Sequence, residues 1–128
     1  MSDISIERRT GGKKTISGET IQTLGQAMRG QLLLPGQEGY DSARIIWNAM
    51  IDKRPAVVAR CAGVADIMRC VAFTGEHDLL LGVRGGGHNI AGNALCEGGF
   101  QIDLSPMRSV RVDPRARSAQ VGPGCTLG

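Results

Sequence analysis

Apolar residues between Ser17 and Pro35 recur at the spacing of an α-helix. Ser17 is a suitable N-cap because its side-chain oxygen can accept a hydrogen bond from a free backbone N–H of the first turn, and Glu19 complements the positive helix end. Pro35-Gly36 is a stop signal for this helix. The positions predicted to face the core are Ile21, Leu24, Met28 and Leu32.

A second, shorter helix is predicted over residues 41–50, with Asp41 as its cap. Its buried side is expected to consist of Ile45, Ile46 and Ala49, with Trp47 packing nearby. Residues 1–17 are expected to form a flexible leader. This pattern divides the chain into a leader over residues 1–18, a helical segment over 19–54 and a third part over 55–128.

Residues 56–83 read as strand, helix, strand. The strands are Ala56–Ala59 and Leu79–Val83, and the helix covers Gly63–Thr74. A crossover of this length usually makes its two strands parallel neighbours with a right-handed connection. The helix residues expected to face inward are Val64, Ile67, Met68, Val71 and Ala72.

Three further strand-like runs follow, over residues 99–103, 109–112 and 118–121. Pro106 and Asp113-Pro114 mark turns between them, so this stretch is expected to be rich in hairpins. The fold class is therefore predicted to be α+β: N-terminal helices followed by a small mixed sheet with a parallel start and an antiparallel continuation.

Composition and charge narrow the function classes only slightly. A chain of 128 residues with 41% hydrophobic residues is enough for one folded domain, and 3% aromatic residues predict an aliphatic core. The net charge is +3, and the densest basic stretch, Arg8–Lys14, contains no aromatic residue that could stack on a base. A solvated tail is therefore favoured over a nucleic-acid-binding arm.

The four cysteines, Cys61, Cys70, Cys96 and Cys125, form no CxxC pair, so neither a zinc ribbon nor a thioredoxin-type site is expected. His77 has no second ligand at metal-binding spacing, and an exposed helix end is the favoured interpretation. The sequence has no apolar run typical of a signal peptide or a membrane span. These features favour a reduced, cytoplasmic protein without metal or membrane partners.

The strongest functional signal is the glycine-rich loop that follows the second strand, Arg84-Gly85-Gly86-Gly87-His88-Asn89. Three consecutive glycines can adopt dihedral angles closed to other residues, so that successive N–H groups form a nest for a phosphate. Arg84 could add a positive charge, His88 and Asn89 add polar groups, and Gly92 keeps the far side of the loop open. A purely structural turn is the alternative.

Familiar phosphate-binding motifs do not fit this loop. A Walker A loop fails because Asn93-Ala94 stands where Lys-Ser/Thr is required. The Rossmann and kinase-type glycine patterns fail because Ile90 occupies the third glycine position, and the segment over 89–99 lacks a helical pattern. A phosphate loop of another kind is indicated.

Two strings, Val83–Gly92 (VRGGGHNIAG) and Gly98–Met107 (GGFQIDLSPM), resemble the FAD-binding PCMH-type domain of the vanillyl-alcohol-oxidase superfamily. The resemblance is greatest to the berberine-bridge-enzyme-like branch and to bacterial FAD-linked oxidases. It covers roughly residues 20–128, including Pro35–Asn48 and Val121–Gly124, and implies that the chain is the first lobe of such a domain.

The resemblance implies a set of residues near the cofactor. The loop amides would hold the FAD pyrophosphate, and the loop histidine would attach to the flavin 8α-methyl group. Asp103, Leu104, Ser105, Gly122 and Gly124 would lie near the cofactor. Cys96 and Cys125 do not match the cysteine that forms a second flavin link in some members. The complete set is Arg84, Gly85, Gly86, Gly87, His88, Asn89, Gly92, Asp103, Ser105, Gly122 and Gly124.

The resemblance therefore implies the N-terminal part of an FAD-linked oxidase, with catalytic residues and a small-molecule substrate site beyond Gly128. Two alternatives stay open. His88 could contact a phosphate without forming a covalent bond, or the chain could be a remnant that folds or self-associates without binding FAD. We expect the 128 residues alone to be inactive, because no general base is identifiable.

Overall fold

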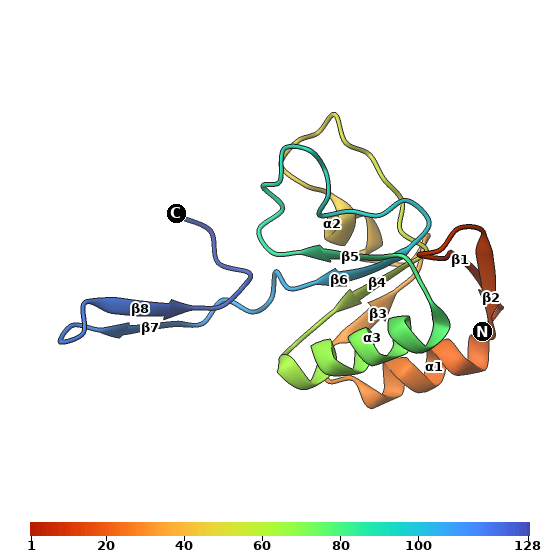
Figure 1. Ribbon diagram of the computed structural model, residues 1–128, viewed down its shortest axis with the longest axis horizontal. Coiled ribbons are helices and arrows are strands. Elements are labelled where there is room, and N and C mark those ends of the chain that lie inside the picture. The colour runs from red at the N-terminus through yellow and green to blue at the C-terminus, as the bar shows by residue number, and fades with distance from the viewer.

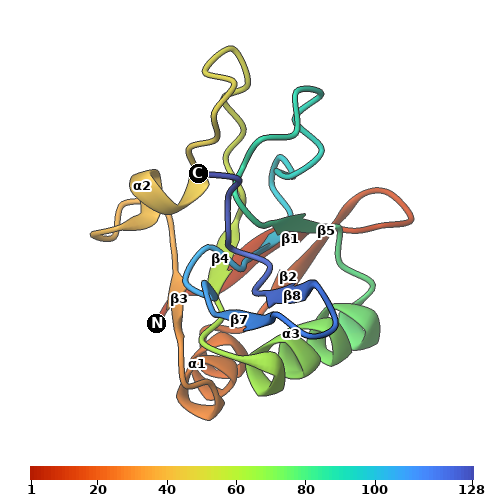
Figure 2. The same ribbon diagram turned by 90° about the vertical axis from the view of Figure 1, so that its left-hand side faces the viewer.

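The structure, a computed structural model, describes residues 1–128 and is built around one four-stranded sheet (Figure 1). Helices α1 and α3 cover one face of this sheet, while α2 and two long loops lie on the other side (Figures 1 and 2). The elements in chain order are β1 (Ile4–Glu7), β2 (Lys13–Ile16), α1 (Gly18–Ala27), β3 (Gln31–Leu33), α2 (Tyr40–Arg44), β4 (Val57–Arg60), α3 (Val64–His77), β5 (Leu81–Arg84), β6 (Phe100–Asp103), β7 (Val110–Asp113) and β8 (Ser118–Val121).

The central sheet has the strand order β3-β4-β6-β5, in which β4, β6 and β5 are parallel and β3 is antiparallel to β4. The fold is thus mixed α and β, as predicted, but the expectation that β4 and β5 are neighbours is wrong because β6 lies between them. Every residue of β6 is buried. The central position suits such a strand because both its faces are covered and both its edges are paired.

Helix α1 begins as predicted and ends earlier. The N–H of Thr20 donates to the side chain of Ser17, 3.2 Å away, which confirms the cap. The helix stops at Ala27, and Leu32 lies in β3 rather than in the helix. The chain turns at Gly30, where a Cβ would lie 1.9 Å from the carbonyl oxygen of Arg60. Only glycine permits this approach of the turn to the end of β4.

Helix α3 occurs where it was expected, but the predicted inward face is wrong. Its buried residues are Asp66, Cys70, Phe73 and Thr74, whereas Val64, Met68 and Val71 are exposed. Apolar residues occupy two sides of this helix, so periodicity alone does not select one. The rotation brings Phe73 against Phe100 of β6, with ring centroids 5.9 Å apart.

The N-terminal segment is an ordered hairpin, so the expectation of a flexible leader is wrong. Strands β1 and β2 pair antiparallel, and Ile6 and Ile16 belong to the main core. The hairpin also joins the body through Glu7, whose N–H donates to the carbonyl of Gly98 and whose carbonyl accepts from Leu80. Burial of two isoleucines gives this segment the apolar contact area that a free leader lacks.

The second predicted helix is short. Helix α2 is capped by Gly39 rather than by Asp41, and it ends at Arg44. Of the residues expected to be buried after it, Ile46 is buried while Ile45 and Ala49 are exposed. Residues 45–53 form no helix because their polar groups contact the glycine-rich loop, as described below.

Strands β7 and β8 confirm the predicted hairpin. They pair only with each other and extend away from the body of the molecule (Figure 1). The run over residues 99–103, which was expected to join this hairpin-rich stretch, instead forms β6 in the main sheet. No helix of the structure is long and apolar enough to cross a membrane.

Candidate functional site

The RGGGHN motif of residues 84–89 begins a longer segment without regular structure, which leaves β5 at Arg84 and runs to Gly99 on the side of the sheet opposite α1 and α3 (Figures 1 and 2). This whole segment is defined here as the glycine-rich loop. The irregular course confirms that no Rossmann-type helix follows the loop. Strand β5 ends beside the buried β6, so the loop begins on a rigid support.

The consecutive glycines are needed for two different reasons. Gly87 has φ +75°, a value that other residues rarely adopt. Gly85 and Gly86 have no positive φ, but a Cβ on Gly85 would lie 2.4 Å from the carbonyl oxygen of Pro123. A Cβ on Gly86 would lie 3.0 Å from the Thr126 side chain. The glycines therefore let the 123–126 segment approach the loop closely.

The backbone N–H groups of the loop are available as donors. None of the N–H groups from Gly85 to Ala91 donates a hydrogen bond to another atom of the protein. Backbone donors require a partner, so these groups bind either water or an external acceptor. A run of such donors in a glycine loop is suited to an anion such as a pyrophosphate.

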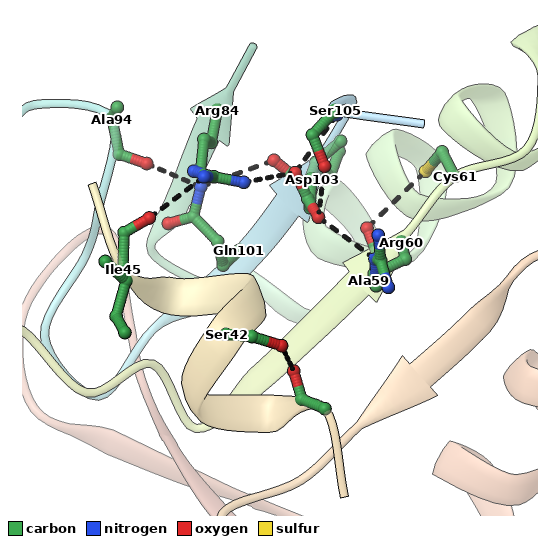
Figure 3. A network of polar contacts seen from close by, with 12 residues as sticks. Ser42, Ile45, Ala59, Arg60, Cys61, Arg84, Ala94, Gln101, Asp103 and Ser105 are labelled. Atoms are coloured by element: carbon green, nitrogen blue, oxygen red, sulfur yellow. Dashed lines mark hydrogen bonds and ion pairs between the residues drawn. The ribbon is translucent and has the colours of Figure 1, made fainter. Parts of the chain in front are cut away.

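Arg84 is held by protein groups. Its Nη1 donates to Oδ1 of Asp103 at 3.0 Å, and its Nη2 donates to the carbonyl oxygen of Ile45 at 2.9 Å (Figure 3). The side chain is largely buried by these contacts. In this arrangement its guanidinium fixes the start of the loop to β6 and to residue 45.

Asp103 is the centre of the polar network shown in Figure 3 and is 0% exposed. Besides Arg84, it faces Nε of Arg60 at 3.3 Å. It also accepts hydrogen bonds from the backbone N–H and the hydroxyl of Ser105, at 3.1 and 3.0 Å. A buried carboxylate needs this many partners. Asp103 and Ser105 therefore lie under the loop and set its position.

Gly122 and Gly124 lie against the turn that follows β6. A Cβ on Gly122 would be 2.3 Å from the carbonyl oxygen of Met107, and one on Gly124 would be 2.4 Å from that of Leu104. This packing carries the following residues to the glycine loop. Between the two segments is a pocket of about 440 Å³ lined by Gly86, His88, Cys125, Thr126, Leu127 and Gly128.

His88 is exposed at this pocket, and its ring is stacked on the indole of Trp47. Asn89 closes its own turn, because its Oδ1 accepts from the N–H of Asn93. Gly92 has φ +77° and lies against the side chain of Ile51. His77 is distant from these residues in the fold. It is half-buried at the end of α3 and packs on Phe73, rather than being fully exposed as expected.

Two groups of residues that hold the loop were not predicted from the sequence. Gln101, buried in β6, donates from Nε2 to the carbonyl oxygen of Ala94 at 2.6 Å (Figure 3). A glutamine inside an apolar strand is an available signal, because buried amides are hydrogen-bonded. The second group lies in residues 45–53. It was missed because a helix was predicted over residues 41–50.

Residues 55–128 match the FAD binding domain family. (R)-6-hydroxynicotine oxidase of Paenarthrobacter nicotinovorans is 32% identical over 102 residues, which is 80% of this chain and 22% of that protein. The crystal structure of 6-hydroxy-D-nicotine oxidase from Arthrobacter nicotinovorans superposes with a TM-score of 0.71 at 33% identity, covering 76% of this chain and 21% of the other.

The fold also recurs in a berberine-bridge-enzyme-like protein of Physcomitrella patens. That structure has a TM-score of 0.70 at 23% identity and covers 81% of this chain and 23% of the other. The chain thus spans only about a fifth of the length of these proteins, between 21% and 23%. Since the family match covers more than half of the chain, the chain belongs to the FAD binding domain family, with the PCMH-type fold of FAD-linked oxidoreductases and FAD as its cofactor.

Proposed function

We propose that the chain is the N-terminal part of an FAD-linked oxidase and that residues 84–89 form the cradle for the FAD pyrophosphate. The observation that carries this proposal is the run of backbone N–H groups from Gly85 to Ala91 without protein acceptors. Two further features fit a pyrophosphate. The loop glycines leave no room for a Cβ beside the 123–126 segment, and a pocket of about 440 Å³ adjoins them.

The predicted site residues fall into two groups under this proposal. Gly85, Gly86, Gly87, His88 and, through its backbone N–H, Asn89 are assigned to direct contact with FAD. Arg84, Gly92, Asp103, Ser105, Gly122 and Gly124 are assigned to holding the loop and its surroundings in place, because their polar groups or backbones already contact other parts of the protein.

His88 is the candidate for a covalent bond to the flavin. A neutral imidazole is a nucleophile, and this one is exposed at the pocket with glycines before it in the chain. Attachment would replace one C–H bond of the 8α-methyl group and the ring N–H bond of His88 by a C–N bond, and both hydrogens would leave as protons. The two electrons set free would pass to the flavin ring and then, with two protons, to dioxygen, which would leave as hydrogen peroxide.

When bound, FAD supplies the acceptor for a hydride from an alcohol or amine carbon of a small-molecule substrate. The role of this chain is to bind and orient the cofactor. The oxidase assignment is supported by the similarity of the chain to (R)-6-hydroxynicotine oxidase of Paenarthrobacter nicotinovorans. Substrate-binding groups are assigned to residues outside the 128 of this chain.

The test is acid precipitation of the chain after expression with ample FAD, followed by a visible absorption spectrum of pellet and supernatant. We expect yellow colour in the pellet of the parent chain and none in the pellet of His88→Ala. The matched control is His77→Gln, since His77 is the second of the two histidines and lies on α3. This variant should retain acid-stable flavin.

Each other outcome removes a defined part of the proposal. Flavin in the supernatant of the parent chain would show binding without a covalent bond, and flavin in the pellet of His88→Ala would place the bond elsewhere. No flavin in either fraction would contradict the cradle and favour a remnant that folds without FAD.

A further inference from the structure

Residues 45–53, defined here as the strap, lie along the glycine-rich loop from its first residue to Gly92. They form no helix or strand, and their polar groups are bonded to the loop at intervals. The contacts, strap residue first, are Ile45 O with Arg84 Nη2 at 2.9 Å, Trp47 N with Gly87 O at 2.9 Å, Asn48 Nδ2 with Ile90 O at 2.9 Å and Lys53 Nζ with Gly92 O at 3.3 Å.

The strap also fixes the far end of the loop by packing. Gly92 has φ +77°, and a Cβ there would lie 2.8 Å from the side chain of Ile51. The strap thus takes up carbonyl groups of the loop while leaving its N–H groups from Gly85 to Ala91 without protein partners. This division of polar groups keeps the donors available for an anion.

Trp47 is the unusual residue of the strap. Trp47 as a whole is 68% exposed, although tryptophan is usually well buried. Its backbone N–H anchors it to Gly87, and its ring lies nearly parallel to the imidazole of His88, with ring centroids 6.2 Å apart and planes inclined by 18°. This distance and inclination are within the range of stacked aromatic pairs. No burial in the core explains the position of the indole.

We propose that Trp47 is a positioning residue that sets the plane of the His88 imidazole for bond formation with the flavin. This inference rests on the proposed function. A stacked indole restricts rotation of the exposed imidazole, so that a ring nitrogen is presented in a fixed direction. The backbone contact of Trp47 with Gly87 orients the loop independently of the indole, so the two effects can be separated by substitution.

The stacking contact itself is tested in the flavin-free chain. Trp47 is the only tryptophan, so its fluorescence reports on it alone. An imidazole stacked on an indole covers one face of its ring, so a soluble quencher such as acrylamide reaches that face less often. We expect acrylamide to quench the emission of Trp47 more strongly in His88→Ala than in the parent chain, and equally in His77→Gln and the parent chain. Equal quenching in His88→Ala and the parent chain would contradict the contact.

The positioning role is tested by the rate at which acid-stable flavin forms in the parent chain, Trp47→Phe and Trp47→Ala. Loss of one stacked pair should slow attachment about three- to tenfold in Trp47→Ala, and a phenyl ring should restore most of the rate. The Kd for FAD, measured from flavin fluorescence in the His88→Ala background, should change by less than about twofold, because the backbone contact persists.

The outcomes separate the inference from the function on which it rests. Equal attachment rates in all three proteins would overturn the positioning role and leave the proposed function intact. A rate that falls only in proportion to FAD affinity, with no rescue by phenylalanine, would assign Trp47 a merely structural role. A chain that shows the difference in acrylamide quenching but binds no FAD would overturn the proposed function, and the positioning role with it.

Discussion

Asp66 shows how one buried side chain determines the path of the backbone. Its carboxylate accepts three backbone N–H groups, from Arg29 at 2.9 Å, Gly30 at 2.8 Å and Ala62 at 2.9 Å. Two of these donors lie in the turn after α1 and the third lies before α3. The carboxylate therefore joins the two helices that cover the sheet, a role that periodicity in sequence does not reveal.

The same contacts make the free energy of unfolding depend on pH. Burial alone would raise the pKa of Asp66, but the N–H donors outweigh it and hold the pKa below its usual value. A lowered folded-state pKa stabilises the fold above the unfolded-state pKa of about 3.9, and this contribution disappears as the pH falls through the folded-state pKa. We expect the free energy of unfolding, measured by urea titration, to decrease over this acidic range.

Asp66→Asn should lower the free energy of unfolding by about 1–3 kcal/mol at neutral pH, because at least one buried N–H loses its acceptor. It should also remove part of the acid dependence. Glu38→Gln is the matched control, since Glu38 is exposed and makes no ion pair. Equal stability of Asp66→Asn and the control would show that the carboxylate contributes nothing.

At the scale of elements, periodicity predicted α1, α3, β4, β5 and the β7–β8 hairpin, because each has a run of consistent apolar spacing. It missed the β1–β2 hairpin, although Ile4 and Ile6 alternate with polar residues as in a strand. Two short alternating runs around Gly11-Gly12 were outweighed by the basic composition of the segment. The basic residues of this segment lie mainly on its exposed face, whereas its attachment to the core depends on two residues, Ile6 and Ile16.

The N-terminal hairpin provides a direct test of its place in the core. Ile6 is 0% exposed, so Ile6→Ala should lower the free energy of unfolding by about 2–5 kcal/mol through lost burial and a cavity. Ser5→Ala is the control, because Ser5 is exposed on the same strand. Chemical denaturation of both variants measures the difference. A change for Ile6→Ala as small as that for Ser5→Ala would mean that the hairpin is detached from the core in solution.

The part of the candidate site that is contiguous in the sequence could be predicted from the sequence. The RGGGHN loop is contiguous, so its residues could be named before the fold was known. The partners that hold the loop could not be named from the sequence. Asp103 reaches Arg84 because β6 pairs with β5 in a register that places the two residues opposite each other, and Trp47 reaches His88 because residues 45–53 are not helical. Strand order and helix ends depend on long-range packing, which a periodic pattern does not encode.

At the scale of the whole molecule, the β7–β8 hairpin is an apolar surface outside the body. Val110 faces Val121 and Val112 faces Ala119 across the two strands, so all four side chains share one face of the hairpin. Each strand also has an outer edge without a partner strand. Exposed apolar faces and free edges favour association with other chains. We therefore expect the isolated 128-residue chain to self-associate through this hairpin.

Sedimentation velocity over a range of protein concentrations measures this association. Val112→Lys should shift the chain toward monomer, because a charge would then have to be buried in the apolar interface. Val64→Lys is a close control, since Val64 and Val112 are each 64% exposed and Val64 lies on α3. Equal weakening by both substitutions would place the contact elsewhere or make it nonspecific, and a parent chain that remains monomeric would remove the hairpin as an association surface.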